Sequence, residues 1–423
     1  MLNVNEVEPV YKSGSAKAPI ILYMMLIALS PLFTFKTAFM SSFIVATAEI
    51  LIMLFLCDRF TIQFKVGSSN SELIPLWLFL LSVITSNLLL LINNDFISIE
   101  IALSITRTFL IFVHVLFSVV LVRYFFIKYD FGYVFKILPL TVVFYLIGLL
   151  LYYMIGGGKF LNNEYDGLPL VQNRRFLGYI VMIASTILSC HILMYRHQIN
   201  QKLIITLITT VINLTFLFWL GGRGAIVSYF ITVIGFTIIQ KYKGESKINH
   251  KGIILLIISL LLSTILSEIT SVYDWNGLFR FAFDTDEVTL NQYTSSRLSM
   301  WIASLDYIYD KPWFGHGSDA YLILGITPHY HPHNFIIQIM LEFGVVGFLL
   351  FSLFFISLLI KSFLFSINNK STIVHDISLC IVVGLFTHGL IDGTIYHATP
   401  LMFLSIFTSY VYFERNVIGE RNA

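Results

Sequence analysis

A cluster of histidines late in the chain is the first place where the residue types could do chemistry. His329, His331 and His333 are each separated by one residue and directly precede an apolar run that continues to Phe363. A neutral imidazole can take up a proton near neutral pH, so one of these side chains could be a general base. The structural alternative is a histidine that is satisfied by hydrogen bonds to neighbouring carbonyls.

A zinc site is the obvious rival for this cluster. Histidines at alternate positions would converge on a metal only in an extended run, and no further histidine cluster or cysteine complements them. Cys57, Cys190 and Cys380 lie in or beside apolar segments and are typical of small core residues. We therefore expect no metal site, no disulfide framework and no cofactor.

Asn334, Gln338 and Glu342 form a second feature. They recur every fourth residue in the apolar run, so a helix would present them as one polar stripe. Titratable groups at a membrane boundary are costly, and their presence there usually indicates a function. We interpret the histidines and this stripe as the reactive edge of an integral membrane enzyme, and we expect Asn334 and Glu342 to contact its substrate.

Several arginines could bind an anionic substrate. Arg223 lies in Gly-Gly-Arg-Gly-Ala between two apolar runs, and Arg297 follows two serines. A guanidinium can hold phosphate or diphosphate oxygens through paired hydrogen bonds. The alternatives are a hairpin with a snorkelling arginine at Arg223 and a surface arginine beside a serine N-cap at Arg297. Arg174 and Arg175 either bind lipid head groups or anchor a helix end.

The composition indicates that these residues belong to a membrane protein. The chain has 423 residues, of which 57% are hydrophobic and 12% charged, and its mean hydropathy is +0.83. A soluble domain carries about 25% charged residues. Apolar runs of about 18 residues predict membrane helices, so we expect an all-α polytopic fold with about twelve spans. They are roughly 19–36, 39–57, 74–93, 98–122, 134–155, 176–195, 203–221, 224–240, 252–269, 334–360, 374–392 and 397–413.

The spans divide the chain into four parts. These are residues 1–175 with helices one to five and a first outer loop, 176–269 with helices six to nine, a large outer loop over 270–333, and 334–423 with helices ten to twelve and a tail. Within the large loop we predict an amphipathic helix near 297–309, with Trp301, Leu305 and Ile308 on one face.

Lysines and arginines predict the orientation. Most of the 26 basic residues fall on one side, with the densest group at Lys241–Lys251, so this side and both termini are expected to be cytoplasmic. The large loop, the histidines and both Arg223 and Arg297 then lie outside, where a basic group more readily serves to bind an anion. The net charge of +2 gives no indication of nucleic acid as a partner.

Two further polar groups remain open. Glu100, Arg107 and His114 recur every seven residues in the fourth span and would share one helix face. They predict either a structural polar seam or the lining of a lipid-phosphate pathway. A weaker group lies near an outer helix end: His388, Asp392 and His397.

Three motifs in this order resemble the bacterial superfamily of O-antigen ligases and O-antigen polymerases. They are Gly-Gly-Arg-Gly-Ala between two spans, then Ser-x-Arg-x-x-x-Trp with a later Pro-Trp-Phe-Gly-His-Gly, and then His-Asn-x-x-x-Gln-x-x-x-Glu-x-Gly-x-x-Gly. The resemblance covers about residues 173–350. It implies a metal-independent glycosyltransferase whose donor is a glycan on undecaprenyl pyrophosphate, at the outer face of the bacterial inner membrane.

The resemblance also implies roles for individual residues. The loop histidine of the superfamily corresponds to His333, its arginine after the short inter-helix turn to Arg223, and its large-loop arginine to Arg297; Arg174 or Arg175 corresponds more loosely. His333 would be the general base, and attack opposite the leaving group would invert the anomeric centre. The Arg-x10-Gly repeats of some polymerases are not present after Arg174 or Arg297.

Polymerase and ligase differ only in the acceptor, which is a lipid-linked repeat unit or lipid A–core. The Phe- and Ile-rich, low-charge chain resembles divergent polymerases, so we expect a polymerase, with a membrane lipid environment and a chain-length regulator as further partners. A twelve-helix transporter is the rival class, but the two halves show no repeat. A peptidoglycan polymerase is a further alternative, although its usual loop acid motif is not evident.

Overall fold

Every predicted span coincides with a helix. The structure, a computed structural model, describes residues 18–33, 38–59, 71–92, 99–126, 129–155, 177–195, 200–243, 248–269 and 294–418. No β-strand occurs within these residues, and the all-α prediction is confirmed. The helices are α1 (Ala18–Ala28), α2 (Ala38–Arg59), α3 (Ile74–Ile92), α4 (Ile99–Val120), α5 (Gly132–Ile155), α6 (Gly178–Leu193), α7 (Gln201–Leu220), α8 (Arg223–Tyr242), α9 (His250–Ile269), α11 (Arg297–Asp310), α12 (Ala320–Ile323), α13 (Phe335–Ile367), α14 (Ile373–Gly389) and α15 (Ala398–Phe413).

The lengths and compositions of these helices are those of a polytopic membrane protein. Among the described residues, seven helices are long and apolar enough to cross a membrane: α3, α4, α5, α7, α8, α9 and α13. Shorter apolar helices accompany them, namely Met40–Leu56 within α2, α6 and α14. The tenth predicted span is longer than expected, because α13 continues to Ile367.

Burial differs sharply between the helices. Nearly every residue of α6 is buried, and this helix packs against α5, α7, α8, α9 and α14. In contrast, α9 exposes Ile254, Ile258, Leu261 and Ile265. An exposed apolar face of this length is expected where a helix meets hydrocarbon.

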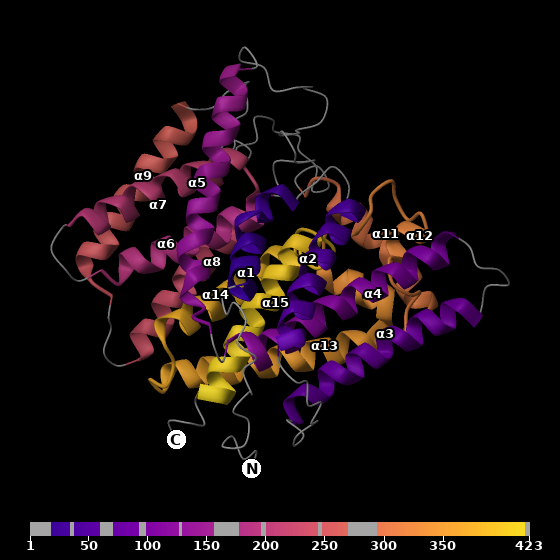
Figure 1. Cartoon of the computed structure of the whole chain (residues 1–423). Coiled ribbons are helices and arrows are strands. Elements are labelled where there is room, and N and C mark those ends of the chain that lie inside the picture. Colours follow the sequence, from indigo (N-terminus) through magenta and orange to yellow (C-terminus); the bar gives the residue numbers. More distant parts are fainter. Residues whose placement is uncertain are drawn as a thin grey trace.

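The helix α13 lies alongside α3 (Figure 1). Phe79 of α3 makes edge-on ring contacts with Phe343 and Phe351 of α13, at centroid distances of 5.7 and 5.4 Å. At the N-terminal end of α13, α11 and α12 from the large loop pack against it through a small apolar cluster that includes Met300, Ile308 and Leu341. The loop therefore lies on the helix that begins next to His333.

The regular helix α13 is interrupted at Gly344, and the loop after α11 fills the interruption. Gly344 has a φ of 67°. The amides of Val345–Val346 donate to the carbonyls of Pro312–Trp313 at 2.8 and 3.2 Å. In return, the amides of His316–Gly317 donate to the carbonyls of Leu341–Glu342 at 2.9 and 3.0 Å. The four main-chain groups that lose their partners within the helix are thereby satisfied by the loop.

This exchange explains the glycines of two separate motifs. A Cβ on Gly315 would lie 2.5 Å from the carbonyl carbon of Glu342, and one on Gly344 would collide with the backbone of Trp313. Both glycines also have positive φ, which side-chain-bearing residues rarely adopt. Pro-Trp-Phe-Gly-His-Gly and Glu-x-Gly-x-x-Gly therefore form one contact.

The predicted loop helix is confirmed as α11, but two details of its prediction are wrong. Its packed face carries Met300, Ser304 and Ile308, whereas Leu305 is 54% exposed. The contact with α13 follows the row 300, 304, 308, and Leu305 lies one position beyond it. The serines do not cap the helix either, because Ser296 has a left-handed backbone and makes no side-chain cap bond.

Candidate active site

His333 is paired with Asp392, a residue 59 positions later in the chain. His333 directly precedes the α13 cap, and Asp392 lies in the segment between α14 and α15. The Nδ1 atom of His333 is 3.1 Å from Oδ1 of Asp392, which also accepts from the amide of Gly393 at 2.8 Å. A carboxylate can only accept, so the proton of a neutral His333 ring lies on Nδ1. This leaves Nε2 able to accept a proton from another molecule.

The carboxyl of Asp392 is held in its ionised form. Burial alone would raise its pKa, but the hydrogen bond from His333 and the nearby charges, including that of Arg297, hold the pKa of Asp392 well below its usual range. The His333 side chain is 24% exposed and that of Asp392 is 13% exposed. The pair is thus an accessible imidazole backed by a more buried anion.

A layer of rings fixes the backbone beneath His333. His333 has a φ of 54°, an unfavourable value for a side-chain-bearing residue. Its amide donates to Nδ1 of His331 at 3.2 Å. His331 stacks on Tyr396 at 4.6 Å, and the guanidinium of Arg107 lies 4.9 Å from the centre of the Tyr396 ring. A side chain at Gly393 would collide with the His331 ring.

His331 must stay neutral for this arrangement to hold. Burial lowers the pKa of His331 well below its ordinary value, and the neighbouring His333 and His397 lower it further. A neutral ring can accept the His333 amide at Nδ1, whereas a protonated ring cannot.

Arg223 begins α8 directly after a glycine turn. Gly221 ends α7 in the left-handed conformation with a φ of 63°, which lets the chain reverse within two residues. The Nη2 atom of Arg223 donates to the hydroxyl of Ser295 at 2.9 Å. An added Cβ on Gly224 would lie 3.3 Å from Nε2 of His388, so the start of α8 is packed against the end of α14.

Arg297 belongs to the same corner of the molecule. It begins α11 two residues after Ser295, the partner of Arg223. The charge of Arg297 lowers the pKa of Asp392, so the guanidinium lies close enough to act on the anion that pairs with His333. Arg223 is thus bonded to the residue two positions before Arg297, and Arg297 acts electrostatically on the partner of His333.

Asn334 is satisfied by structural contacts. Its side chain accepts from the amides of Ile336 and Ile337 at 2.9 and 3.2 Å, which makes it the N-cap of α13. Its Nδ2 atom donates to the carbonyl of Leu390 at 3.1 Å and thereby ties the helix start to the segment that carries Asp392. Contact of Asn334 with substrate stays a prediction.

Glu342 lies in a second polar group, deeper along α13. It accepts from Gln338 at 3.1 Å, is 3% exposed, and lies about 12 Å along the helix from Asn334. Both Gln338 and Glu342 line a mainly apolar cavity of about 120 Å³, together with Arg107 and His114. The polar stripe is confirmed, but contact of Glu342 with substrate stays a prediction.

The predicted polar face of the fourth span is confirmed for two of its three members. Arg107 and His114 are buried, and both line the cavity. Arg107 donates to the carbonyl of Ile395 at 2.8 Å, and His114 is 2.9 Å from Glu49. The prediction is wrong for Glu100, which is exposed in the first turn of α4.

The sequence indicated some residues that the structure does not describe, and it indicated two residues of the site weakly or not at all. Arg174 and Arg175 lie outside the described residues. The sequence indicates Asp392 only weakly, because no local motif shows that this carboxylate pairs with a histidine 59 positions earlier. Tyr396 was not predicted at all; the only indication was that it follows an Asp-Gly turn between two spans. No group of three His, Cys, Asp or Glu side chains in the described part of the chain is arranged to hold a metal ion.

One comparison with known proteins matches a segment in the central part of the chain. Residues 208–352 match a protein-family model described as O-Antigen ligase. This segment covers less than half of the chain, but it contains Arg223, Arg297 and His333. A search of curated proteins gave no match. That family implies a glycosyltransferase-like membrane enzyme that acts on a lipid-linked glycan and an acceptor, and over these residues the chain is similar to the superfamily of O-antigen ligases and polymerases.

Proposed function

We propose that this protein polymerises undecaprenyl-pyrophosphate-linked oligosaccharide repeat units into O-antigen or capsular polysaccharide. The reaction takes place at the periplasmic face of the bacterial inner membrane, and both termini are cytoplasmic. The observation that carries the proposal is the His333–Asp392 pair, supported by the electrostatic effect of Arg297 on Asp392 and by the bond from Arg223 to Ser295 beside Arg297. An imidazole base beside two guanidinium groups suits glycosyl transfer from a diphosphate donor.

The base in this reaction is His333. A hydroxyl of the acceptor sugar gives its proton to Nε2 of His333, while Nδ1–H stays bonded to Asp392. The hydroxyl oxygen attacks the anomeric carbon, and the bond from that carbon to the diphosphate oxygen breaks with its electron pair. Attack from the side opposite the leaving group inverts the anomeric centre. The Asp392 carboxylate stabilises the imidazolium that forms, as in other histidine–carboxylate pairs.

The leaving group is stabilised by arginine. Undecaprenyl diphosphate departs as an anion, and it needs neutralisation more than protonation. Arg223 and Arg297 supply fixed positive charge and paired donors where that charge develops. This would replace the divalent metal of other glycosyltransferases, so we propose that the reaction is metal-independent. Full activity after removal of metals by a chelator is expected, and loss of activity that added Mg²⁺ restores would refute this part.

A ligase is the second candidate function, because the matched family model is described as O-Antigen ligase. The same residues would then transfer the finished glycan to lipid A–core. In the polymerase case we further expect a chain-length regulator protein as a partner.

The experiment that separates these outcomes is a glycan gel of a deletion strain. Complementation is tested with the wild type, His333→Ala, Arg223→Ala and Arg297→Ala, with membrane levels measured by immunoblot. A polymerase defect leaves single repeat units on core, whereas a ligase defect leaves long chains on the lipid carrier. Normal chains in the His333→Ala strain at normal protein level would contradict both proposals.

A further inference from the structure

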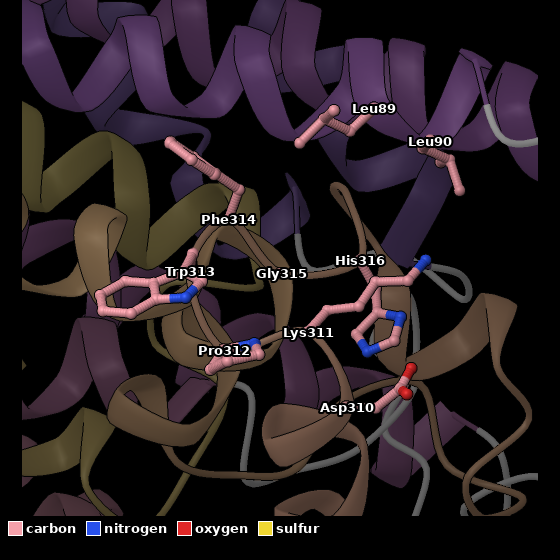
Figure 2. Close-up of a pocket in the computed structure, with 9 residues that line it drawn as sticks. All are labelled: Leu89, Leu90, Asp310, Lys311, Pro312, Trp313, Phe314, Gly315 and His316. Carbon is pink, nitrogen blue, oxygen red and sulfur yellow. The ribbon is translucent and has the colours of Figure 1, made fainter.

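A second pocket lies apart from the His333 corner, between the end of α3 and the loop that follows α11. Figure 2 shows Leu89 and Leu90 pointing from α3 towards the loop, with the stretch Asp310–His316 opposite. The cavity has a volume of about 250 Å³. Asp310 ends α11 and Arg297 begins it, so the length of this helix, about 20 Å, separates the pocket from the proposed donor site.

The position of the pocket is that of a membrane surface. α3 is long enough to span a bilayer, and Leu89 and Leu90 lie in its last turn before Ile92. The end of such a span lies near the polar head groups. Ile92 is 76% exposed and Trp313 of the loop is 67% exposed. An exposed apolar helix end beside an exposed tryptophan is the pattern of the membrane interface.

The exposed surface next to the pocket has the same character. Ile302, Leu305 and Tyr309 are exposed along one side of α11 and lead to Trp313. They recur at helical spacing, so they form one apolar face. A helix with such a face lies favourably at the boundary between head groups and acyl chains.

The loop is held rigidly against the helices. Its main chain is bonded into the interruption of α13, as described above, and Gly315 leaves no room for a side chain there. His316 is buried and its Nε2 atom is 2.8 Å from the carbonyl of Tyr307. The pocket is therefore formed before any ligand enters, which lowers the entropic cost of binding.

The polar end of the pocket carries one cation and one anion. Figure 2 shows the amine of Lys311 and the carboxylate of Asp310 on either side of the His316 ring, while Trp313 points to the other side. Burial lowers the pKa of His316, and Lys311 lowers it further, although the Tyr307 carbonyl and Asp310 act in the opposite direction. His316 is thus neutral at neutral pH, and the charges to be matched are those of Lys311 and Asp310.

We propose that this pocket binds the head group of an aminophospholipid, as in phosphatidylethanolamine. The phosphate lies against Lys311, the primary ammonium against Asp310, and the start of the acyl chains against Leu89 and Leu90. An anionic lipid would match Lys311 but would face the Asp310 carboxylate. A ligand with both charges satisfies both side chains, and this site does not depend on the glycosyl-transfer proposal.

Native mass spectrometry of the full-length protein from nanodiscs tests the assignment. The nanodiscs contain equal amounts of phosphatidylethanolamine and phosphatidylglycerol. The wild type is expected to retain phosphatidylethanolamine in preference, and Lys311→Gln and Asp310→Asn are each expected to lower that occupancy about five-fold. Lys251→Gln, a change at an exposed lysine on α9, is the matched control and should retain it fully.

Three results would overturn the proposal. They are preference for phosphatidylglycerol in the wild type, equal occupancy in the wild type and both pocket variants, or full displacement by millimolar phosphoethanolamine, which would indicate a site for a free ion. A second test leaves Lys311 and Asp310 unchanged and measures tryptophan fluorescence. Brominated phosphatidylethanolamine should quench the fluorescence of the wild type more than that of Trp313→Phe, and equal quenching would place the lipid elsewhere.

Discussion

Charged side chains have different partners at the two ends of the helix bundle, although α8 and α14 run from one end to the other. α8 begins at Arg223 and is followed by Lys243, and α14 begins near Asp376 and ends beside His388. Lys243 and Asp376 form a buried ion pair at the end opposite the His333 corner. At that corner Arg223 donates to a serine hydroxyl. Twenty residues of α8, about 30 Å, separate the two environments.

The opposite end contains further paired charges among the described residues. Gln240 and Ser371 also donate to Asp376, at 2.7 and 2.6 Å. Arg415 and Lys361 both pair with Glu72. Buried charges that are matched by opposite charges hold helices in register but have little left to offer a ligand. The bond from Arg223 to Ser295 at the other end is exposed, so an anionic substrate can reach that guanidinium.

The largest effect is expected at His333. His333→Ala removes the proposed base and should lower the transfer rate by about 10²–10⁴-fold. His329→Ala is the matched control, because this exposed ring lies 6.2 Å from His333, and it should keep the rate within about two-fold. The measurement is repeat-unit transfer by membranes of equal protein content. Equal rates in the two variants would remove His333 from the chemistry.

The opposite end should respond in stability instead of rate. Asp376→Ala leaves Lys243 buried and unmatched, and it should destabilise the protein by about 3–5 kcal/mol. The double variant Lys243→Met/Asp376→Leu removes both charges and should recover most of the loss. Thermal unfolding in detergent measures both. If the single variant unfolds at the wild-type temperature, the contrast between the two ends is wrong.

Next in size are the effects of the arginines. Arg223→Ala and Arg297→Ala should each lower the transfer rate by about 10²–10³-fold, since each removes a donor that stabilises the leaving diphosphate. Arg223→Lys and Arg297→Lys keep the charge but lose the paired geometry, so intermediate rates are expected. Each variant is compared with Lys251→Ala at the opposite end. A rate loss that is the same for Ala and Lys would indicate packing and not charge.

The sequence predicted the helices far better than their contacts. Long apolar runs decide where membrane helices form, because each such helix satisfies its own main chain. The interruption of α13 was not predicted. Gly344 lies in an apolar run, and nothing near it indicates that a loop thirty residues earlier supplies its hydrogen bonds.

The site was predicted only in part, because local patterns in the sequence do not show contacts between distant residues. Arg223 and Arg297 begin helices and His333 precedes the N-cap of α13, so local motifs identify them. Asp392 and Tyr396 act through contacts with residues more than fifty positions away, and no local pattern encodes such pairs. The Asn334 stripe was found from its spacing, but spacing could not distinguish a helix cap from a substrate contact.

The smallest effect is expected from pH, and it concerns the ring layer of the His333 corner. Because burial lowers the pKa of His331 in the folded protein, the unfolded chain binds a proton near pH 6.5 that the folded state does not. The folded state should therefore lose up to about 1.4 kcal/mol for each pH unit below 6.5, and pH changes above 6.5 should have no such effect. His331→Asn keeps an acceptor for the His333 amide without a titrating ring, so its melting temperature should fall less between pH 6.5 and 5. If the melting temperature falls equally between pH 6.5 and 5 in the wild type and in this variant, His331 is not the buried neutral base beneath His333.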